Sequence, residues 1–192
     1  ELDTVEEKLE LLDNITHVSE SLNTTIEHLN EVVSIQTNSN QLKVEVNFAN
    51  TLEQVTTSIN QIIENNNVTI NSDFSKAEII EYIPAYLDSI FLNLLTNAIK
   101  YKHKDRDPVI NISTSRDFTN YDRVVLKISD NGLGIDMDKF GDKLFGMYKT
   151  FHYNADARGI GLFITKNQVE SLNGEISATS DINLGTTFTI KF

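Results

Sequence analysis

The sequence contains no cysteine, which excludes a disulfide scaffold and any metal site built on thiolates. It also lacks an apolar run near the roughly 20 residues needed to cross a bilayer. The first residues are acidic and give no sign of a signal peptide. We therefore expect a cytoplasmic domain, with any membrane anchor of the parent protein outside these residues.

Positive charge is scarce. The chain has 16 Lys and Arg against 28 Asp and Glu, a formal net charge of −12. A strongly acidic protein repels phosphate, so we expect no general nucleic-acid binding. One local cationic site for a small anionic ligand remains compatible with this balance. Hydrophobic residues make up 40%, enough for an ordinary globular core.

Glycine and proline are absent from residues 1–37, and this segment is predicted to be one helix. Apolar residues recur there at steps of mostly three or four, which is typical of an amphipathic helix. They are Val5, Leu9, Leu12, Ile15, Leu22, Ile26, Leu29 and Val33. Such a helix would be roughly 50 Å long and would project from a domain about 40 Å across. A second copy of the helix is the simplest partner for its apolar stripe.

Strands and helices alternate irregularly after a polar linker at 36–41. Alternating or β-branched runs predict strands at 42–46, 68–70, 78–83, 108–115, 123–129, 175–179 and 186–192. Helices are predicted at 49–66, at 84–102, where Pro84 suits the first turn, and at 159–172. A loop rich in Gly and Asp is expected from 130 to about 158. This mixture favours a sheet with helices packed on one face.

The helix over 87–102 carries an unusual polar face. Asn93, Asn97, Lys100 and Tyr101 share one side because they are spaced four, three and one apart. The apolar side consists of Phe91, Leu94, Leu95 and Ala98. An Asn oxygen can ligate Mg²⁺, and a nearby Lys can neutralise phosphate charge. A solvated helix face is the alternative interpretation.

Three glycine-containing segments follow this helix. Asp130-Asn-Gly132-Leu-Gly134 follows an apolar strand, where a carboxylate could accept a hydrogen bond from an exocyclic amine; an ordinary turn is the alternative. Gly159-Ile-Gly161 opens a helix, whose free N–H groups suit phosphate; an ordinary loop-to-helix junction is the alternative. Gly185-Thr-Thr-Phe188 by itself indicates only the start of a strand.

The order and spacing of these segments resemble the N, G1, G2 and G3 boxes of sensor histidine kinases, in the GHKL superfamily that includes gyrase and MutL-type ATPases. The sequence from Asn93 to Tyr101, NLLTNAIKY, is similar to the N box, and Phe145 to Phe151, FGMYKTF, to the F box of the ATP lid. The resemblance covers about 42–192. It implies an α+β, Bergerat-type two-layer sandwich with a mixed sheet and helices on one face, preceded by a long N-terminal helix. Residues 1–37 resemble the second helix of the dimerisation and phosphotransfer hairpin.

The resemblance also implies roles for single residues. Asn97 would coordinate Mg²⁺, and Asn93 and Lys100 would contact phosphate oxygens. Tyr101 would pack near the nucleoside. Lys149 would be the lid cation near the γ-phosphate and, with Asn97, the catalytic pair.

For the other boxes, Asp130 would bind the adenine amine, and Gly132 and Gly134 would shape the pocket floor. Gly159 and Gly161 would line the triphosphate, and Thr187 would lie near the adenine end. One departure is Ala157, where the family often has glycine. This difference bears on the flexibility of the lid at its C-terminal hinge and not on nucleotide binding itself.

Phosphoryl transfer is favoured over hydrolysis because Asn93 occupies the position of the water-activating Glu of the gyrase and MutL branch. A carboxamide cannot serve as a general base near neutral pH. The expected enzyme is an ATP:protein-histidine phosphotransferase in a two-component system, with a response-regulator partner and a homodimer through the N-terminal helix. A hydrolysing ATPase and a degenerate nucleotide-binding adaptor are the alternatives.

The phosphoacceptor is not expected among the four histidines of the chain. His17 and His28 lie where the second hairpin helix is expected, and neither is followed by the acidic or amide residue of the acceptor box. The other two are His103 and His152; His152 falls in the lid segment, where contact with the ligand and a structural or solvent-facing role are the alternatives. The acceptor is therefore expected outside these residues.

Overall fold

The computed structural model describes residues 8–16, 18–19, 26, 42–117, 119, 122–147 and 159–192. The chain divides into two units, Glu1–Asn38 and Ser39–Phe192. In the first unit, the described residues are helical, and Leu9, Leu12 and Ile15 are each at least 55% exposed. None of the helices that the structure describes is both long enough and apolar enough to span a membrane.

The second unit contains seven strands in its described residues. They are β1 (Val44–Asn47), β2 (Thr69–Asp73), β3 (Ile79–Tyr82), β4 (Val109–Arg116), β5 (Val124–Asp130), β6 (Glu175–Asp181) and β7 (Gly185–Lys191). The helices are α2 (Phe48–Ser58), α3 (Asn60–Asn65), α4 (Pro84–Lys100), α5 (Met137–Phe140), η1 (Gly141–Lys143), a 3-10 turn, and α6 (Gly161–Glu170).

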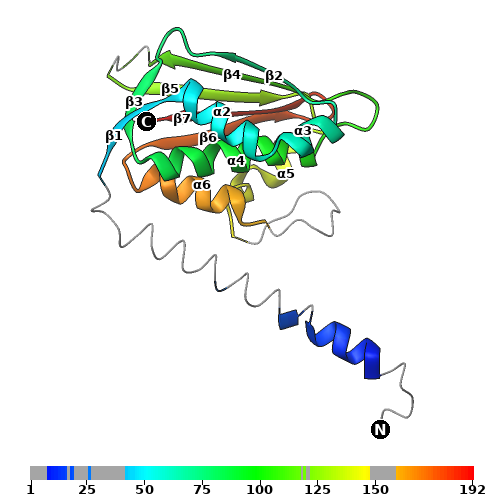
Figure 1. The fold of residues 1–192 in the computed structure, drawn as a ribbon. Helices are drawn as coiled ribbons and strands as arrows, with labels where there is room; N and C mark the ends of the chain where they lie inside the picture. The colour runs from blue at the N-terminus through cyan, green and yellow to red at the C-terminus, as the bar shows by residue number, and fades with distance from the viewer. Residues whose placement is uncertain are drawn as a thin grey trace. The chain divides into compact units, whose positions relative to one another are not determined.

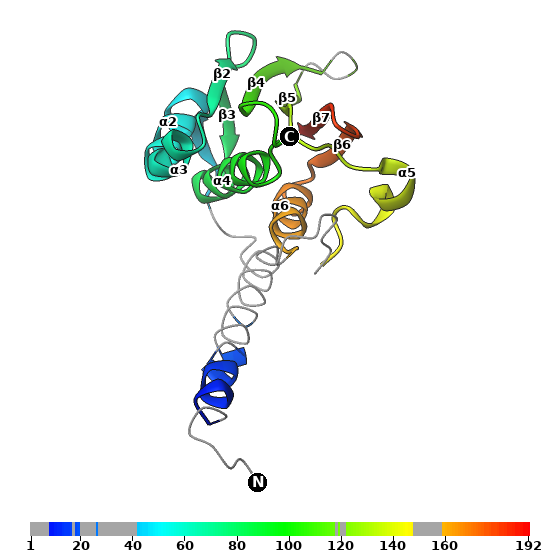
Figure 2. The ribbon, with the colours of Figure 1, turned by 90° about the vertical axis from the view of Figure 1, so that its right-hand side faces the viewer.

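Five strands form one mixed sheet in the order β2-β4-β5-β7-β6. β2 and β4 are parallel, and the other neighbours are antiparallel. β1 and β3 form a separate antiparallel ribbon. The helices α2, α4 and α6 lie on one face of the sheet (Figures 1 and 2). The predicted α+β two-layer architecture is confirmed.

Helix α4 is central to the core. Pro84 occupies its first turn, where a missing N–H removes no intrahelical bond. Its side chains Leu87, Ile90, Phe91 and Leu95 are fully buried, and the helix packs against α2 and α6. This packing fixes the orientation of the opposite, polar side of α4.

Two local predictions differ from the structure. The helix predicted over 49–66 is interrupted at Ile59, which separates α2 from α3. Before the break, the hydroxyl groups of Thr57 and Ser58 donate to main-chain carbonyls three or four residues earlier, a pattern that weakens helices. The loop expected after Asp130 contains α5 and η1; the Asp136 carboxylate caps α5 by accepting the Lys139 N–H at 3.1 Å.

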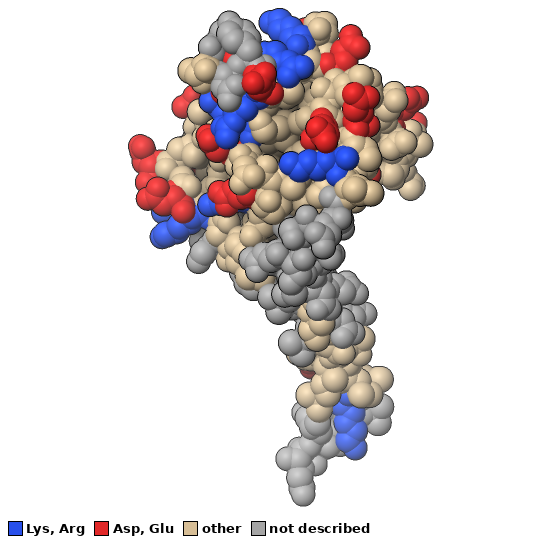
Figure 3. All heavy atoms as spheres, turned by 90° about the vertical axis from the view of Figure 1, so that its left-hand side faces the viewer, with Lys and Arg blue, Asp and Glu red and all other residues tan. Residues whose placement is uncertain are grey.

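The end of the sheet at the β4–β5 connection is held by ion pairs. Lys191 Nζ lies 2.9 Å from Asp117 Oδ2, and this bond holds the pKa of the Asp117 carboxyl well below its usual range. Arg123 lies 2.8 Å from Glu175 and also donates to the Asn173 carbonyl at 3.3 Å. On the face shown in Figure 3, Lys and Arg side chains are interspersed with Asp and Glu.

Candidate nucleotide-binding site

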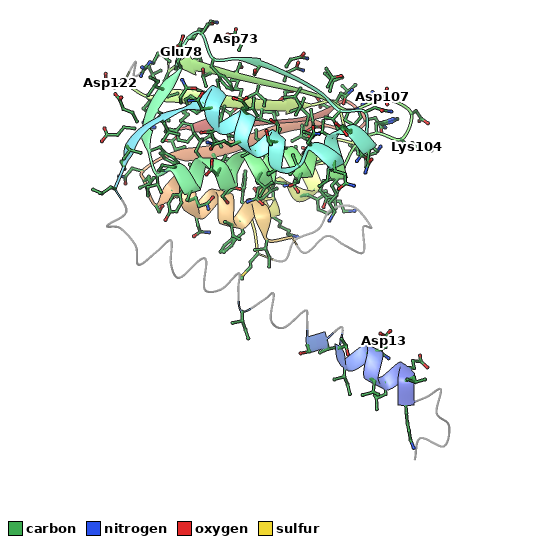
Figure 4. All side chains as sticks on the ribbon, viewed as in Figure 1. Asp13, Asp73, Glu78, Lys104, Asp107 and Asp122 are labelled. Carbon is green, nitrogen blue, oxygen red and sulfur yellow. The ribbon has the colours of Figure 1, made fainter. Side chains whose placement is uncertain are left out.

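The motif residues gather at the end of the sheet where β5 finishes, opposite the Lys191–Asp117 pair. The last residue of β5 is Asp130, six residues after the strand begins. Figure 4 marks the two ends: Lys104 and Asp107 lie on the loop between α4 and β4 beside the site, and Asp122 lies at the other end. The site is therefore separated from the far ion pairs by the length of a strand, roughly 20 Å.

Asp130 lies on the helix-covered face of the sheet, the face it shares with Leu126 and Ile128 because strand side chains alternate. Its Oδ1 accepts the N–H of Gly132 at 2.7 Å and that of Thr186 at 3.3 Å. Burial nevertheless raises the pKa of the Asp130 carboxyl. The described residues provide no donor to Oδ2, which leaves this oxygen available to a ligand.

Gly132 and Gly134 let three segments pack closely around Asp130. A Cβ on Gly132 would lie 2.5 Å from the Tyr101 carbonyl oxygen and 2.9 Å from Asp130 Oδ1. Gly134 has a φ of +67°, and a Cβ there would collide with the Asp181 backbone. The Leu133 N–H donates to the Tyr101 carbonyl at 2.9 Å. The segment from Asp130 to Gly134, which resembles the G1 box, is thus fixed between the end of α4 and the β6–β7 turn.

Two residues that the sequence did not single out hold this segment. The Arg106 guanidinium donates to the carbonyls of Asn131, at 2.7 Å, and Gly132, at 3.1 Å, and also to that of Asn183. The Asn131 side chain accepts the Val109 N–H at 2.9 Å and donates to the Asp107 carbonyl. An Asn directly after Asp130 was a visible turn signal. Nothing local marked Arg106, because its three acceptors are distant in sequence.

Asn93 of the N box on α4 lies close to Gly161, the first residue of α6, in the segment that resembles the G2 box. A Cβ on Gly161 would lie 3.0 Å from Asn93 Oδ1, so the glycine allows this approach. Asn93 Nδ2 lies 3.5 Å from both Ser89 Oγ and Thr165 Oγ1, at the long limit of hydrogen bonding. Thr165 is fully buried. The carboxamide nitrogen of Asn93 therefore faces these hydroxyls, and its oxygen faces the first residue of α6.

Asn97, Lys100 and Tyr101 continue the polar side of α4 toward Asp130. All three are half-buried. Lys100 Nζ lies 5.9 Å from the centre of the Tyr101 ring, within reach of a cation–π contact. Burial raises the pKa of the Tyr101 phenol, so this side chain is neutral near pH 7.

Thr187 lies apart from the carboxylate of Asp130. Its hydroxyl donates to Ser129 Oγ at 2.9 Å, and Ser129 is on the opposite face of β5 from Asp130. The neighbouring Thr186 is buried and donates its N–H to Asp130. The structure thus brings Thr186, which the sequence motif did not single out, beside the carboxylate.

Only part of the predicted ATP lid lies within the residues that the structure describes. Lys149, His152 and Ala157 lie outside the described residues. The F box begins inside them: the Phe145 ring packs edge-on against Phe188 at 6.5 Å. Gly159 is described and has a φ of +67°. The first residue of the F box is therefore anchored on the core of the sheet.

A partly buried carboxylate at a strand end, carboxamides along one helix and a glycine at the start of another converge on one end of the unit. This arrangement defines a nucleotide-binding α+β catalytic domain. Residues 83–192, more than half of the chain, match the family described as histidine kinase-, DNA gyrase B-, and HSP90-like ATPase. The chain belongs to this family, and the predicted relationship to sensor histidine kinases is confirmed.

Two proteins, a sensor protein and a histidine protein kinase, are also similar to this chain. The chain is 31% identical over 108 residues to the sensor protein RprX of Bacteroides fragilis, covering 55% of this chain and 20% of that protein. It is 25% identical over 185 residues to the histidine protein kinase SaeS of Staphylococcus aureus, covering 94% of this chain and 52% of SaeS. The chain thus spans about half or less of the length of these relatives.

Solved structures show the same fold. The Acinetobacter baumannii histidine kinase AdeS superposes with a TM-score of 0.71 at 20% identity, covering 98% of this chain and 84% of that one. The catalytic domain of the histidine kinase ThkA gives a TM-score of 0.64 at 20% identity, covering 78% of this chain and 95% of that one.

Proposed function

We propose that this chain is the ATP-binding catalytic part of a sensor histidine kinase and transfers the γ-phosphoryl group of ATP to a histidine outside these residues. The observation that carries the proposal is the half-buried carboxylate of Asp130, whose Oδ2 receives no hydrogen bond from the described residues. Helix α4 contacts both the segment after Asp130 and the start of α6. One end of this site suits an adenine amine, and the other suits phosphates.

The residues take the following parts. Asp130 accepts the exocyclic amine of adenine, and Tyr101 packs against the nucleoside. Asn93 and Lys100 contact phosphate oxygens beside Gly161, and Gly159 leaves room for the triphosphate. Lys149 supplies a lid cation, and Thr187 lies one position beyond the residue that bonds Asp130. Response-regulator binding and dimerisation belong to the same proposal.

Mg²⁺ fits the donor set at Asn97. A carboxamide oxygen is a hard ligand suited to Mg²⁺, and the described residues make no hydrogen bond to the Asn97 side chain that would occupy it. When bound, the ion would neutralise charge on the phosphates. Asn97 would hold it from α4, a helix whose position is fixed by its buried face.

Transfer to an acceptor is favoured over hydrolysis because of Asn93. Its Nδ2 faces two hydroxyls, and its oxygen faces Gly161. A carboxamide in this position orients a ligand but cannot abstract a proton from water near pH 7. Hydrolysis-driven motion, the alternative, would need a carboxylate at this point of α4.

Titration calorimetry with a non-hydrolysable ATP analogue, with and without Mg²⁺, tests the site. We expect binding that strengthens at least tenfold with Mg²⁺ and an Asn97→Ala variant that loses this enhancement. Asn111→Ala is the matched control, because Asn111 is exposed and its side chain bonds only the side chain of Asn71 on β2 among the described residues. No binding in either condition would favour the degenerate adaptor.

A further inference from the structure

The loop between α4 and β4 carries a cation that the phosphate site does not use. Arg106 belongs to this loop, yet its guanidinium bonds carbonyls on two other segments: Asn131 and Gly132 after β5, and Asn183 in the β6–β7 turn. Asn183 has a left-handed φ of 64° and donates its N–H to the Leu133 carbonyl at 2.7 Å. Arg106 therefore joins two loops that already contact each other.

The planar guanidinium is suited to this task. Its five N–H donors have a fixed geometry, so one side chain can hold several carbonyls in set directions. A lysine ammonium carries no such fixed fork and would not hold acceptors on both loops in the same directions. Because each acceptor is a main-chain carbonyl, the contacts restrain the path of the backbone and not a single side chain.

The restrained backbone is the one that orients Asp130. The Gly132 N–H donates to Asp130 Oδ1 at 2.7 Å, and the Gly132 carbonyl is one of the groups that Arg106 holds. The second donor to Oδ1 is the Thr186 N–H, just beyond the turn that contains Asn183. Both N–H groups that engage Oδ1 thus lie within a few residues of carbonyls held by Arg106.

We propose that Arg106 is a positioning residue for base recognition: by fixing the two loops that engage Oδ1, it directs Oδ2 of Asp130 toward the amine of the base. The inference rests on the proposed function, because it assigns the specificity of that same adenine site. The positive charge of Arg106 also lowers the pKa of Asp130 against the effect of burial, which favours the acceptor form of the carboxyl.

The experiment compares two ligands, ATP and purine riboside triphosphate, which has a hydrogen in place of the exocyclic amine. Calorimetry with Mg²⁺ gives the affinity ratio of the two. We expect the parent chain to prefer ATP at least tenfold, and Arg106→Gln to weaken ATP binding about fivefold. Binding of purine riboside triphosphate should change less than about twofold, since it has no amine for Asp130 to bind. Arg106→Lys should not restore the full preference.

Arg123→Gln is the matched control. It removes the same charge from a guanidinium that also bonds a main-chain carbonyl, at the other end of the sheet. Its ATP preference should equal that of the parent. Equal losses for both ligands in Arg106→Gln would leave the affinity ratio unchanged and would mean that Arg106 only stabilises the fold. No loss for either ligand would also overturn the proposal. If the parent binds ATP without preferring it, the role of Arg106 fails while the nucleotide site stands; if the parent binds neither ligand, both proposals fail.

Discussion

At the scale of single residues, the site depends on how one carboxylate is held. Asp130 receives two N–H donors on Oδ1, which favour its ionised form, while burial favours its protonated form. Burial dominates, so the pKa of Asp130 is raised. The carboxylate is thus costly to keep ionised, and this cost is offset when Oδ2 accepts a donor from a ligand.

Replacement of Asp130 should change both the affinity for ATP and the dependence of that affinity on pH. Asp130→Asn should weaken ATP binding about 10- to 100-fold, because a hydrogen bond to a charged acceptor is lost. In the parent, affinity should fall as pH drops through the raised pKa of Asp130, since only the ionised form accepts at both oxygens. Calorimetry over a pH series measures both effects, and the variant should lack this decline.

The same group acts in the opposite direction on stability. The folded state binds the Asp130 proton more tightly than the unfolded chain, so its contribution to the free energy of unfolding grows as pH falls through the folded pKa. Nucleotide binding and stability should therefore respond oppositely to acid at this one residue. An affinity that rises on acidification in the parent alone would contradict the assignment.

At the scale of elements, α4 has two roles on two sides. Its apolar side forms the centre of the core, and its polar side places Asn93, Asn97 and Lys100 along the site. Since the helix is rigid, the depth to which the apolar side is buried fixes the distances on the polar side. The core residues of α4 therefore act on nucleotide binding through position, without touching the ligand.

Two leucines on this helix form a matched pair. Leu95 is fully buried, whereas Leu92 is 41% exposed. Leu95→Ala should lower the free energy of unfolding by about 2–5 kcal/mol, because it leaves a cavity between packed elements. Leu92→Ala should cost less than about 1 kcal/mol. Urea unfolding followed by circular dichroism measures the difference; equal costs would contradict the central role of α4.

At the scale of the whole molecule, the two units differ in what they bury. The second unit has its own core, with Phe48, Phe91, Leu126 and Ile190 nearly inaccessible to solvent. In the first unit, the apolar side chains of the described helical residues remain exposed, including Leu9 and Leu12 at 60%. Exposed apolar side chains on one helix are typical of a helix that packs against a partner.

We predict that this stripe supports self-association. Leu12→Glu combined with Ile15→Glu should raise the dimer dissociation constant at least tenfold, because charge would be placed inside the apolar seam. Asn14→Glu, which adds charge beside the stripe on the same helix, should change it little. Light scattering over a concentration series measures the constant. A parent chain that remains monomeric at all concentrations would contradict the prediction that the stripe supports self-association.

The sequence by itself determined the α+β class, the polar side of α4, and the strand that leads to Asp130. These follow from short-range periodicity and from turn residues, which act within a few positions of the chain. It placed most strands to within a few residues, including β4 and β5. It missed the break at Ile59 and the short α5, because competing local hydrogen bonds decide both.

Only the tertiary structure decided which groups meet around the carboxylate. Arg106 reaches carbonyls 25, 26 and 77 residues away, and Thr186 reaches Asp130 across 56 residues. It also placed Thr186 rather than Thr187 beside Asp130, because the pairing of β7 with β5 sets which face each side chain occupies. Pattern and propensity describe neighbours in sequence, whereas these contacts arise from strand register and loop packing between distant segments.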